Sequence, residues 1–287
     1  MIAILKREFK SYLHNVSGFI FIAFLLTFVG FFTAAQNLFG GSASFEYALY
    51  NVVIVFLLIV PILTMRSISE EKHNRTDQLL YSLPVSMKEV VIAKYLAMIC
   101  IFLIPMAVIC LYPFLLSAFG IMNYASAYGA ILGLFLLGSA LIAICTFISS
   151  LTESQIIAAV LGFGVLLVLY LMSGFSAIIP TTALASFICL VLTSALLALL
   201  VYVLTQNFNV AVIVAAVCVI PLCLVYMIKA SLFSGLFPAI LSYLAVFDRF
   251  YIFAYGIFDV TAIVYYLSVI VFFLFLTVQV MEKKRWS

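Results

Sequence analysis

The segment RSISEEKHNRTDQLLYSLPVSMKEVVIAKY, residues 66–95, gathers charge in a chain that has little of it elsewhere. It holds nine of the 23 Asp, Glu, Lys and Arg side chains of a 287-residue sequence that is 68% apolar. Soluble domains are about half apolar, because they cover their surface with polar groups. A surface that faces hydrocarbon needs no such cover. The composition therefore indicates a membrane protein, and the net charge of +3 is too small to indicate a nucleic-acid partner.

Eight apolar stretches are about 20 residues long, the length that a helix needs to cross the hydrocarbon core. We therefore expect an all-α polytopic membrane protein. Within 230–260, Gly235, Pro238 and Gly256 interrupt the apolar pattern, which predicts short external helices before the last span. The predicted spans are 18–38, 47–65, 95–118, 126–149, 156–174, 183–204, 209–229 and 261–281.

Residues 1–16 predict an amphipathic helix that lies flat in the lipid headgroup layer. Its apolar side chains share one helical face and its basic side chains fall elsewhere. The apolar face consists of Ile2, Leu5, Phe9, Tyr12, Leu13 and Val16. A cleaved signal peptide is the alternative, because a basic stretch precedes an apolar one. The apolar run is too long for a typical signal peptide, which favours an uncleaved first span.

The distribution of Lys and Arg predicts the orientation in the membrane. With eight crossings and a cytoplasmic N-terminus, eleven of the 13 basic residues lie on the cytoplasmic side, and only Lys229 and Arg249 lie outside. Cytoplasmic loops of membrane proteins carry such an excess of basic residues. Both termini are therefore expected in the cytoplasm, with 66–94 as the main cytoplasmic loop.

Two capping-box patterns predict two helices in this loop. Ser67 precedes Glu70 by three residues, Ser86 precedes Glu89 by three, and Pro84 separates the two patterns. The second helix would run directly into the third span. The first would offer both charges and leucines, which fits either a docking helix for a soluble partner or a solvated linker with a few interfacial leucines.

The sequence carries no recognisable energy source or catalytic site of its own. No charged residue or His falls in the middle of a predicted span, whereas proton-driven carriers typically have titratable groups there. None of the 13 glycines precedes a Lys, so the phosphate-binding G-x-x-x-x-G-K-[ST] motif is absent. The six cysteines lie in apolar runs without CxxC spacing, which favours small buried residues over a disulfide or metal site. We predict no catalytic, cofactor-binding or metal-binding residue.

The charged loop resembles the loop between the second and third spans of ABC transporter permeases of the type-2 exporter class. Glu70, Glu71 and Lys72 open the similar stretch, and Glu89 and Lys94 close it. Arg75 stands where that family usually has glycine, and Asp77 replaces a longer acidic residue. The resemblance implies that this loop receives force from a separate ATPase subunit that binds ATP and Mg²⁺. The implied ATPase-coupling residues are Glu70, Glu71, Lys72, Arg75, Thr76, Asp77, Leu79, Leu80, Leu83, Pro84 and Glu153.

Two further stretches, 149–160 and 247–286, resemble the gliding-motility-type branch of this family. The resemblance implies a non-catalytic permease domain over residues 1–287, with 183–229 as an extra helix pair. It also implies a plasma-membrane exporter that assembles with a second permease copy or a sister permease, and it allows an accessory membrane subunit. The substrate-binding residues are not indicated.

Two other functions fit the same composition. The first is a secondary carrier or channel that works without an ATPase, and the lack of mid-membrane charge counts against it. The second is a membrane scaffold or assembly protein, and the capped charged loop counts mildly against that.

Overall fold

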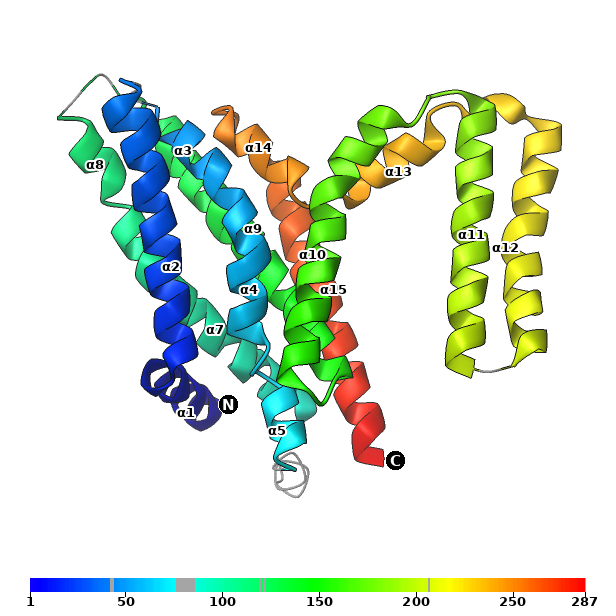
Figure 1. Cartoon of the computed structure of the whole chain (residues 1–287), viewed down its shortest axis with the longest axis horizontal. Coiled ribbons are helices and arrows are strands. Elements are labelled where there is room, and N and C mark those ends of the chain that lie inside the picture. Colours follow the sequence, from blue (N-terminus) through cyan, green and yellow to red (C-terminus); the bar gives the residue numbers. More distant parts are fainter. Residues whose placement is uncertain (42–43, 76–85, 119, 121, 206, 287) are drawn as a thin grey trace. The chain divides into compact units, whose positions relative to one another are not determined.

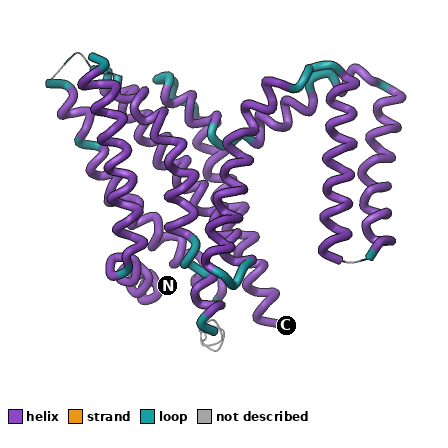
Figure 2. Tube along the Cα trace, in the orientation of Figure 1, coloured by secondary structure: helices purple, strands orange, loops and turns teal. Residues whose placement is uncertain are grey.

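The computed structural model contains helices and loops only, in the residues that it describes (Figure 2). It describes the whole chain except residues 42–43, 76–85, 119, 121, 206 and 287. This confirms the predicted all-α fold. Contacts divide the chain into two compact units, Met1–Val168 with Val246–Ser287, and Leu169–Ala245.

The first unit contains most of the long helices (Figure 1). In chain order these are α1 (Ile2–His14), α2 (Val16–Thr33) with the π-helical turn Ala34–Phe39, α3 (Phe45–Val52), α4 (Phe56–Thr64), α5 (Ser69–His73), α7 (Met87–Ile109), α8 (Tyr112–Leu116), α9 (Tyr124–Leu151), the first part of α10 (Gln155–Ile178), α14 (Asp248–Ala254) and α15 (Val260–Trp286).

Seven helical stretches of the described chain are long and apolar enough to cross a membrane, or eight if Ala230–Leu244 and Asp248–Ala254 together form one span. The seven stretches correspond to seven of the eight predicted spans. The predicted span 183–204 falls on α11 (Ala183–Thr205), whose described apolar stretch Ala183–Leu199 is shorter than the seven. The seven are Val16–Phe39, Phe45–His73, Met87–Leu116, Tyr124–Leu151, Gln155–Ile178, Phe208–Ile228 and Val260–Lys283.

Helix α9 forms the centre of the first unit and contacts α4, α7, α14 and α15. Small residues on α9 allow this close packing. A Cβ atom on Gly138 would lie 2.5 Å from the ring of Phe102, and one on Gly133 would lie 2.8 Å from the ring of Phe253. The Phe102 ring also meets the Phe21 ring edge-on, with 5.9 Å between the centroids. Aromatic rings thus fill the space that the glycines leave open.

The two ends of the first unit differ in charge. Helices α1 and α5, the α9–α10 turn and the C-terminal end of α15 lie together at what we call the basic end (Figure 1). The start of α3, with α8 and α14, lies at the opposite end. The two chain termini therefore lie at the same end of this unit, as the count of spans and the basic residues predict.

Helix α1 divides its side chains between neighbouring helices and the exposed surface. It packs against α2 and α7, and Tyr12 is buried. The side chains of Ile2 and of Val16, the first residue of α2, are 78% and 68% exposed. Exposed apolar side chains at these two positions agree with contact with lipid, and the side of α1 that packs against its neighbours also carries Glu8, which meets a buried lysine.

The second unit is built around a pair of helices, α11 (Ala183–Thr205) and α12 (Phe208–Ile228), followed by Ala230–Phe233 and α13 (Leu236–Leu244). The ring of Phe187 on α11 stacks on that of Tyr226 on α12, with 4.4 Å between the centroids. Phe233 contacts both rings edge-on. The interpretation of 183–229 as a pair added to a family core stays a prediction.

The six cysteines are all free. Cys145 is buried, whereas the other five are partly exposed. The expectation of six buried cysteines was therefore wrong for five of them. The exposed side of an apolar span faces lipid rather than water. A cysteine there behaves as a small apolar side chain and leaves no strong hydrogen-bonding group without a partner.

Candidate functional site

The basic end contains a fully buried lysine, Lys94, near the start of the long helix α7. This helix begins as predicted, because the Ser86 side chain accepts a hydrogen bond from the backbone N–H of Glu89 at 3.3 Å. Lys94 lies two turns into the helix and is 2% exposed. A buried ammonium group is costly unless it is paired and hydrogen-bonded, so its partners define the site.

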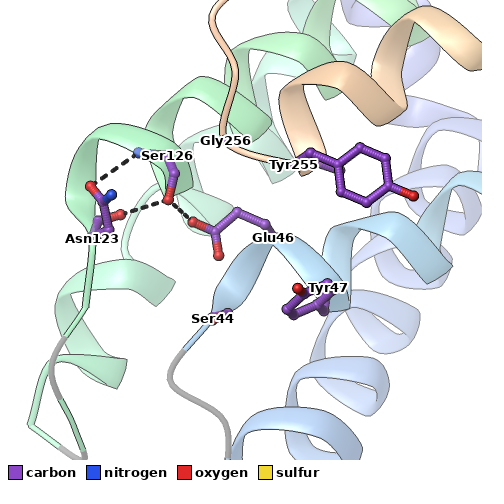
Figure 3. A pocket seen from close by; sticks show the side chains of 8 residues that line it. Ser44, Glu46, Tyr47, Asn123, Ser126, Tyr255 and Gly256 are labelled. Carbon is purple, nitrogen blue, oxygen red and sulfur yellow. Dashed lines mark hydrogen bonds between the residues drawn. The ribbon is translucent and has the colours of Figure 1, made fainter.

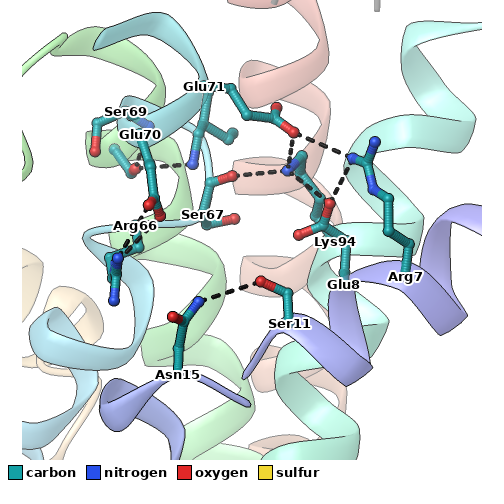
Figure 4. Close-up of polar contacts among 12 residues, drawn as sticks. Arg7, Glu8, Ser11, Asn15, Arg66, Ser67, Ser69, Glu70, Glu71 and Lys94 are labelled. Carbon is teal, nitrogen blue, oxygen red and sulfur yellow. Dashed lines mark hydrogen bonds and ion pairs between the residues drawn. The ribbon is translucent and has the colours of Figure 1, made fainter. Parts of the chain in front are cut away.

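Lys94 is held by two carboxylates and a carbonyl from other parts of the chain (Figure 4). Its Nζ lies 2.8 Å from Glu71 Oε1 and 3.3 Å from Glu8 Oε1. It also donates a hydrogen bond of 2.9 Å to the carbonyl of Ser67. The second cation is Arg7, which lies 2.7 Å from Glu8 and 3.3 Å from Glu71. We call these four charged residues, Arg7, Glu8, Glu71 and Lys94, the ion cluster.

The ion cluster has two positive and two negative groups, so it has no net charge. Each carboxylate meets both cations, which is the arrangement that lets buried charges offset their desolvation. The pKa of Arg7 is raised, first by its hydrogen bond to Glu8 and further by the negative charges of Glu8 and Glu71, although partial burial opposes this. The cluster therefore joins α1, α5 and α7 at one point.

Helix α5 is also fastened to the C-terminal end of α9. The Ser149 hydroxyl accepts hydrogen bonds from the backbone N–H groups of Ile68, at 3.3 Å, and Ser69, at 3.2 Å. The Lys72 ammonium is buried and donates a hydrogen bond to the carbonyl of Ser150. These contacts fix both the start and the middle of α5 on α9.

The capping box predicted at Ser67–Glu70 was wrong. Helix α5 begins at Ser69, and the preceding residue, Ile68, provides no side-chain cap. A capping box satisfies the free N–H groups at a helix start from within the same segment. Here Ser149, on a distant helix, satisfies them instead, and Glu70 is free to form a two-pronged ion pair with Arg66, at 3.0 and 3.1 Å.

A family model described as ABC-2 family transporter protein matches residues 3–208, more than half of the chain. The chain belongs to the ABC-2 transporter family. It is thus a membrane protein of the permease type, which is typically a non-catalytic component and in general has an ATPase partner. No curated protein and no solved structure matches the chain. The ion cluster lies within the part that the ABC-2 model matches.

The predicted coupling residues of this ABC-2 permease fall into three groups. Glu71 and Lys72 face inward, and Glu70 is half-buried in its pair with Arg66. Arg75 and Glu153 are exposed at the basic end. Thr76, Asp77, Leu79, Leu80, Leu83 and Pro84 lie outside the described residues. The coupling role of all of them stays a prediction.

Arg75 has a backbone conformation that favours glycine. Its φ of +55° lies in the left-handed region, which ends the turn after α5. Only glycine adopts this conformation without a steric cost from Cβ. Glycine, which usually stands at this position in the permeases that the loop resembles, would adopt this conformation at a lower steric cost than the arginine of this ABC-2 chain.

Sequence analysis missed several residues of this site. It assigned Arg7 and Lys94 to the set of basic residues on the cytoplasmic side and gave no role to Glu8, Ser149 or Ser150. Two signals were present. Glu8 is the only acidic residue in 1–16, and Lys94 is the only charge in the apolar run VVIAKYLA. A lone acidic residue in a basic segment, or a lone charge in an apolar run, is a candidate for a buried ion pair.

Proposed function

We propose that this ABC-2 protein is the permease subunit of an ATP-driven exporter of the gliding-motility-type branch. In this proposal a separate ATPase chain binds ATP and Mg²⁺ and acts on the loop 66–94. The observation that carries it is the attachment of α5: the Lys94–Glu71 ion pair joins it to α7, and Ser149 and Lys72 join it to α9. A partner that moves α5 would move two membrane spans with it.

Apolar contacts add to this connection. Ile68, just before α5, is buried with Met87 and Val91 of α7 and with Val278 and Met281 of α15. The start of the loop therefore rests on a third long helix. A short lever transmits force only if it does not bend against its supports, and packed apolar side chains with ion pairs meet that need.

The predicted coupling residues would then have two different tasks. The exposed Arg75 and Glu153 would contact the ATPase, together with the predicted contact residues between 76 and 84. The inward-facing Glu71 and Lys72 would transmit the movement to α7 and α9. ATP binding favours the inward or the outward state of the permease only to the extent that the ATP-bound ATPase binds that state more tightly than the other.

The assembly follows from the family resemblance. We propose a second permease copy or a sister permease beside this chain, with room for an accessory membrane subunit, in the plasma membrane. The excess of basic residues at the end that carries α5 supports a cytoplasmic ATPase on that side.

The test is purification of the native complex through a tag on this chain. An ATPase subunit with a phosphate-binding loop is expected to copurify. In the double variant Arg75→Glu/Glu153→Lys, the amount of copurified ATPase should fall more than tenfold, because two exposed contacts are reversed in charge. Lys10→Glu is the matched control, because Lys10 is also exposed at the basic end but lies on α1 and is not one of the predicted coupling residues.

Substitutions of Glu71 are a less specific test of docking, because they also break the ion cluster. The proposal is contradicted if no ATPase accompanies the wild-type chain, or if the double variant retains it with full ATP hydrolysis. Uphill solute transport by the isolated chain in sealed vesicles without an ATPase would favour the secondary carrier instead.

A further inference from the structure

A buried carboxylate, Glu46, lies at the opposite end of the first unit. It stands in the first turn of α3, and its side chain is 7% exposed. It lines a cavity of about 370 Å³ between α3, the start of α9 and the end of α14 (Figure 3). Other lining residues are Tyr47, Asn123, Ser126, Tyr255 and Gly256. Sequence analysis gave Glu46 no role.

The carboxylate of Glu46 has no positive partner in the described part of the chain. Its one hydrogen-bond donor is the hydroxyl of Ser126, which donates to Oε1. No ion pair among the described residues includes Glu46. A neutral hydroxyl offsets little of the cost of burying an ionised carboxylate. Its second oxygen, Oε2, has no hydrogen-bond donor in the described residues, and the side chain lines the cavity.

The backbone holds the walls of this cavity in place. Asn123 caps α9 by accepting hydrogen bonds from the N–H groups of Ala125, at 3.1 Å, and Ser126, at 3.4 Å, which fixes the position of Ser126. Across the cavity, Gly256 has a φ of +78°, and a Cβ atom there would lie 3.2 Å from Cβ of Ser126. A glycine is therefore needed both for the turn after α14 and for the close approach to α9.

We propose that this cavity binds the ammonium group of a small organic cation, with Glu46 as its anionic partner. The volume is near the lower limit of small-molecule pockets, which is about 300 Å³. It is large for a bare metal ion, which would also require several more oxygen ligands. Tyr47 and Tyr255 also line the cavity, and aromatic rings attract ammonium groups through their π faces. Two sources share this chemistry: a free amine and the headgroup of an amine-bearing lipid.

The first test measures binding of choline and ethanolamine to the full-length protein in nanodiscs of phosphatidylglycerol, by isothermal titration calorimetry. We expect saturable binding to the wild type and an affinity at least tenfold weaker in Glu46→Gln, which keeps the shape and loses the charge. Asp259→Asn is the matched control, because Asp259 is a partly exposed carboxylate that does not line the cavity, so its loss should leave the affinity unchanged.

The second test separates the two sources. If a lipid headgroup occupies the cavity, nanodiscs that contain phosphatidylethanolamine should weaken choline binding to the wild type and raise its melting temperature, and neither effect should occur in Glu46→Gln. If the ligand is a free amine, the lipid composition should have no effect.

The proposal is overturned if the wild type binds neither amine and shows no response to phosphatidylethanolamine, or if Glu46→Gln binds within twofold of the wild type. Tyr255→Ala provides the test if Glu46→Gln does not fold, because the Tyr255 side chain is 67% exposed and its loss should weaken binding about threefold without unfolding the chain. None of these measurements requires an ATPase, so their outcome is independent of the proposed coupling function.

Discussion

The two ends of the first unit each contain a buried charge, but the charge is surrounded by different partners at each end. At the basic end, Lys94 is 2% exposed and meets two carboxylates and a backbone carbonyl. At the opposite end, Glu46 is 7% exposed and meets one hydroxyl beside a cavity. Both residues stand near the beginning of a helix that leads into a membrane span.

This difference separates a structural role from a binding role. A buried charge that is fully paired contributes rigidity, because every displacement costs Coulomb energy in a medium of low dielectric constant. A buried charge that lacks a counter-ion gains by acquiring one from outside the protein. The ion cluster is thus suited to transmit force, and Glu46 is suited to hold a ligand.

The largest effect is expected for Lys94→Met. This change leaves Glu8 and Glu71 close together without their shared buried cation, and removal of one partner from a buried pair costs about 3–5 kcal/mol. The free energy of unfolding in detergent should fall by that amount. Lys88→Met is the control, since Lys88 is exposed on the same helix. An equal stability of the two variants would show that the ion cluster is not a structural joint.

An intermediate effect is expected for Lys72→Met. The substitution leaves the buried carbonyl of Ser150 without the Lys72 ammonium, and a hydrogen bond to a charged group contributes about 1.5–3 kcal/mol. Hydrogen exchange should show earlier opening of α5 relative to α9. His73→Gln, an exposed change in the same helix, should leave the exchange rates of α5 as they are. Unchanged exchange in Lys72→Met would show that α5 does not depend on this contact.

The smallest effect, and one of opposite sign, is expected for Glu46→Gln. In the absence of a ligand, neutralising an uncompensated buried carboxylate should leave the melting temperature unchanged or raise it by an amount equivalent to about 1 kcal/mol or less. Glutamine can still accept the hydrogen bond from Ser126. A loss of stability as large as that of Lys94→Met would mean that both ends use their buried charges in the same way.

The sequence predicted the helices well because their signals are local. Apolar length gave the spans, and the excess of basic residues placed both termini at one end. The Ser86–Glu89 pattern located the start of α7, where all the interacting groups lie within one turn. The Ser67–Glu70 pattern failed because Ser149, which is distant in sequence, took over the same N–H groups.

The sequence by itself determined that this chain is a multi-span membrane protein whose charge is concentrated in one loop, because hydrophobicity and helical periodicity are properties of neighbouring residues. Only the tertiary structure decided that Glu8 and Glu71 meet Lys94, that α9 caps α5, and that Glu46 is left beside a cavity. These contacts join residues on separate helices, and no local pattern specifies which side chains will face one another across a helix interface.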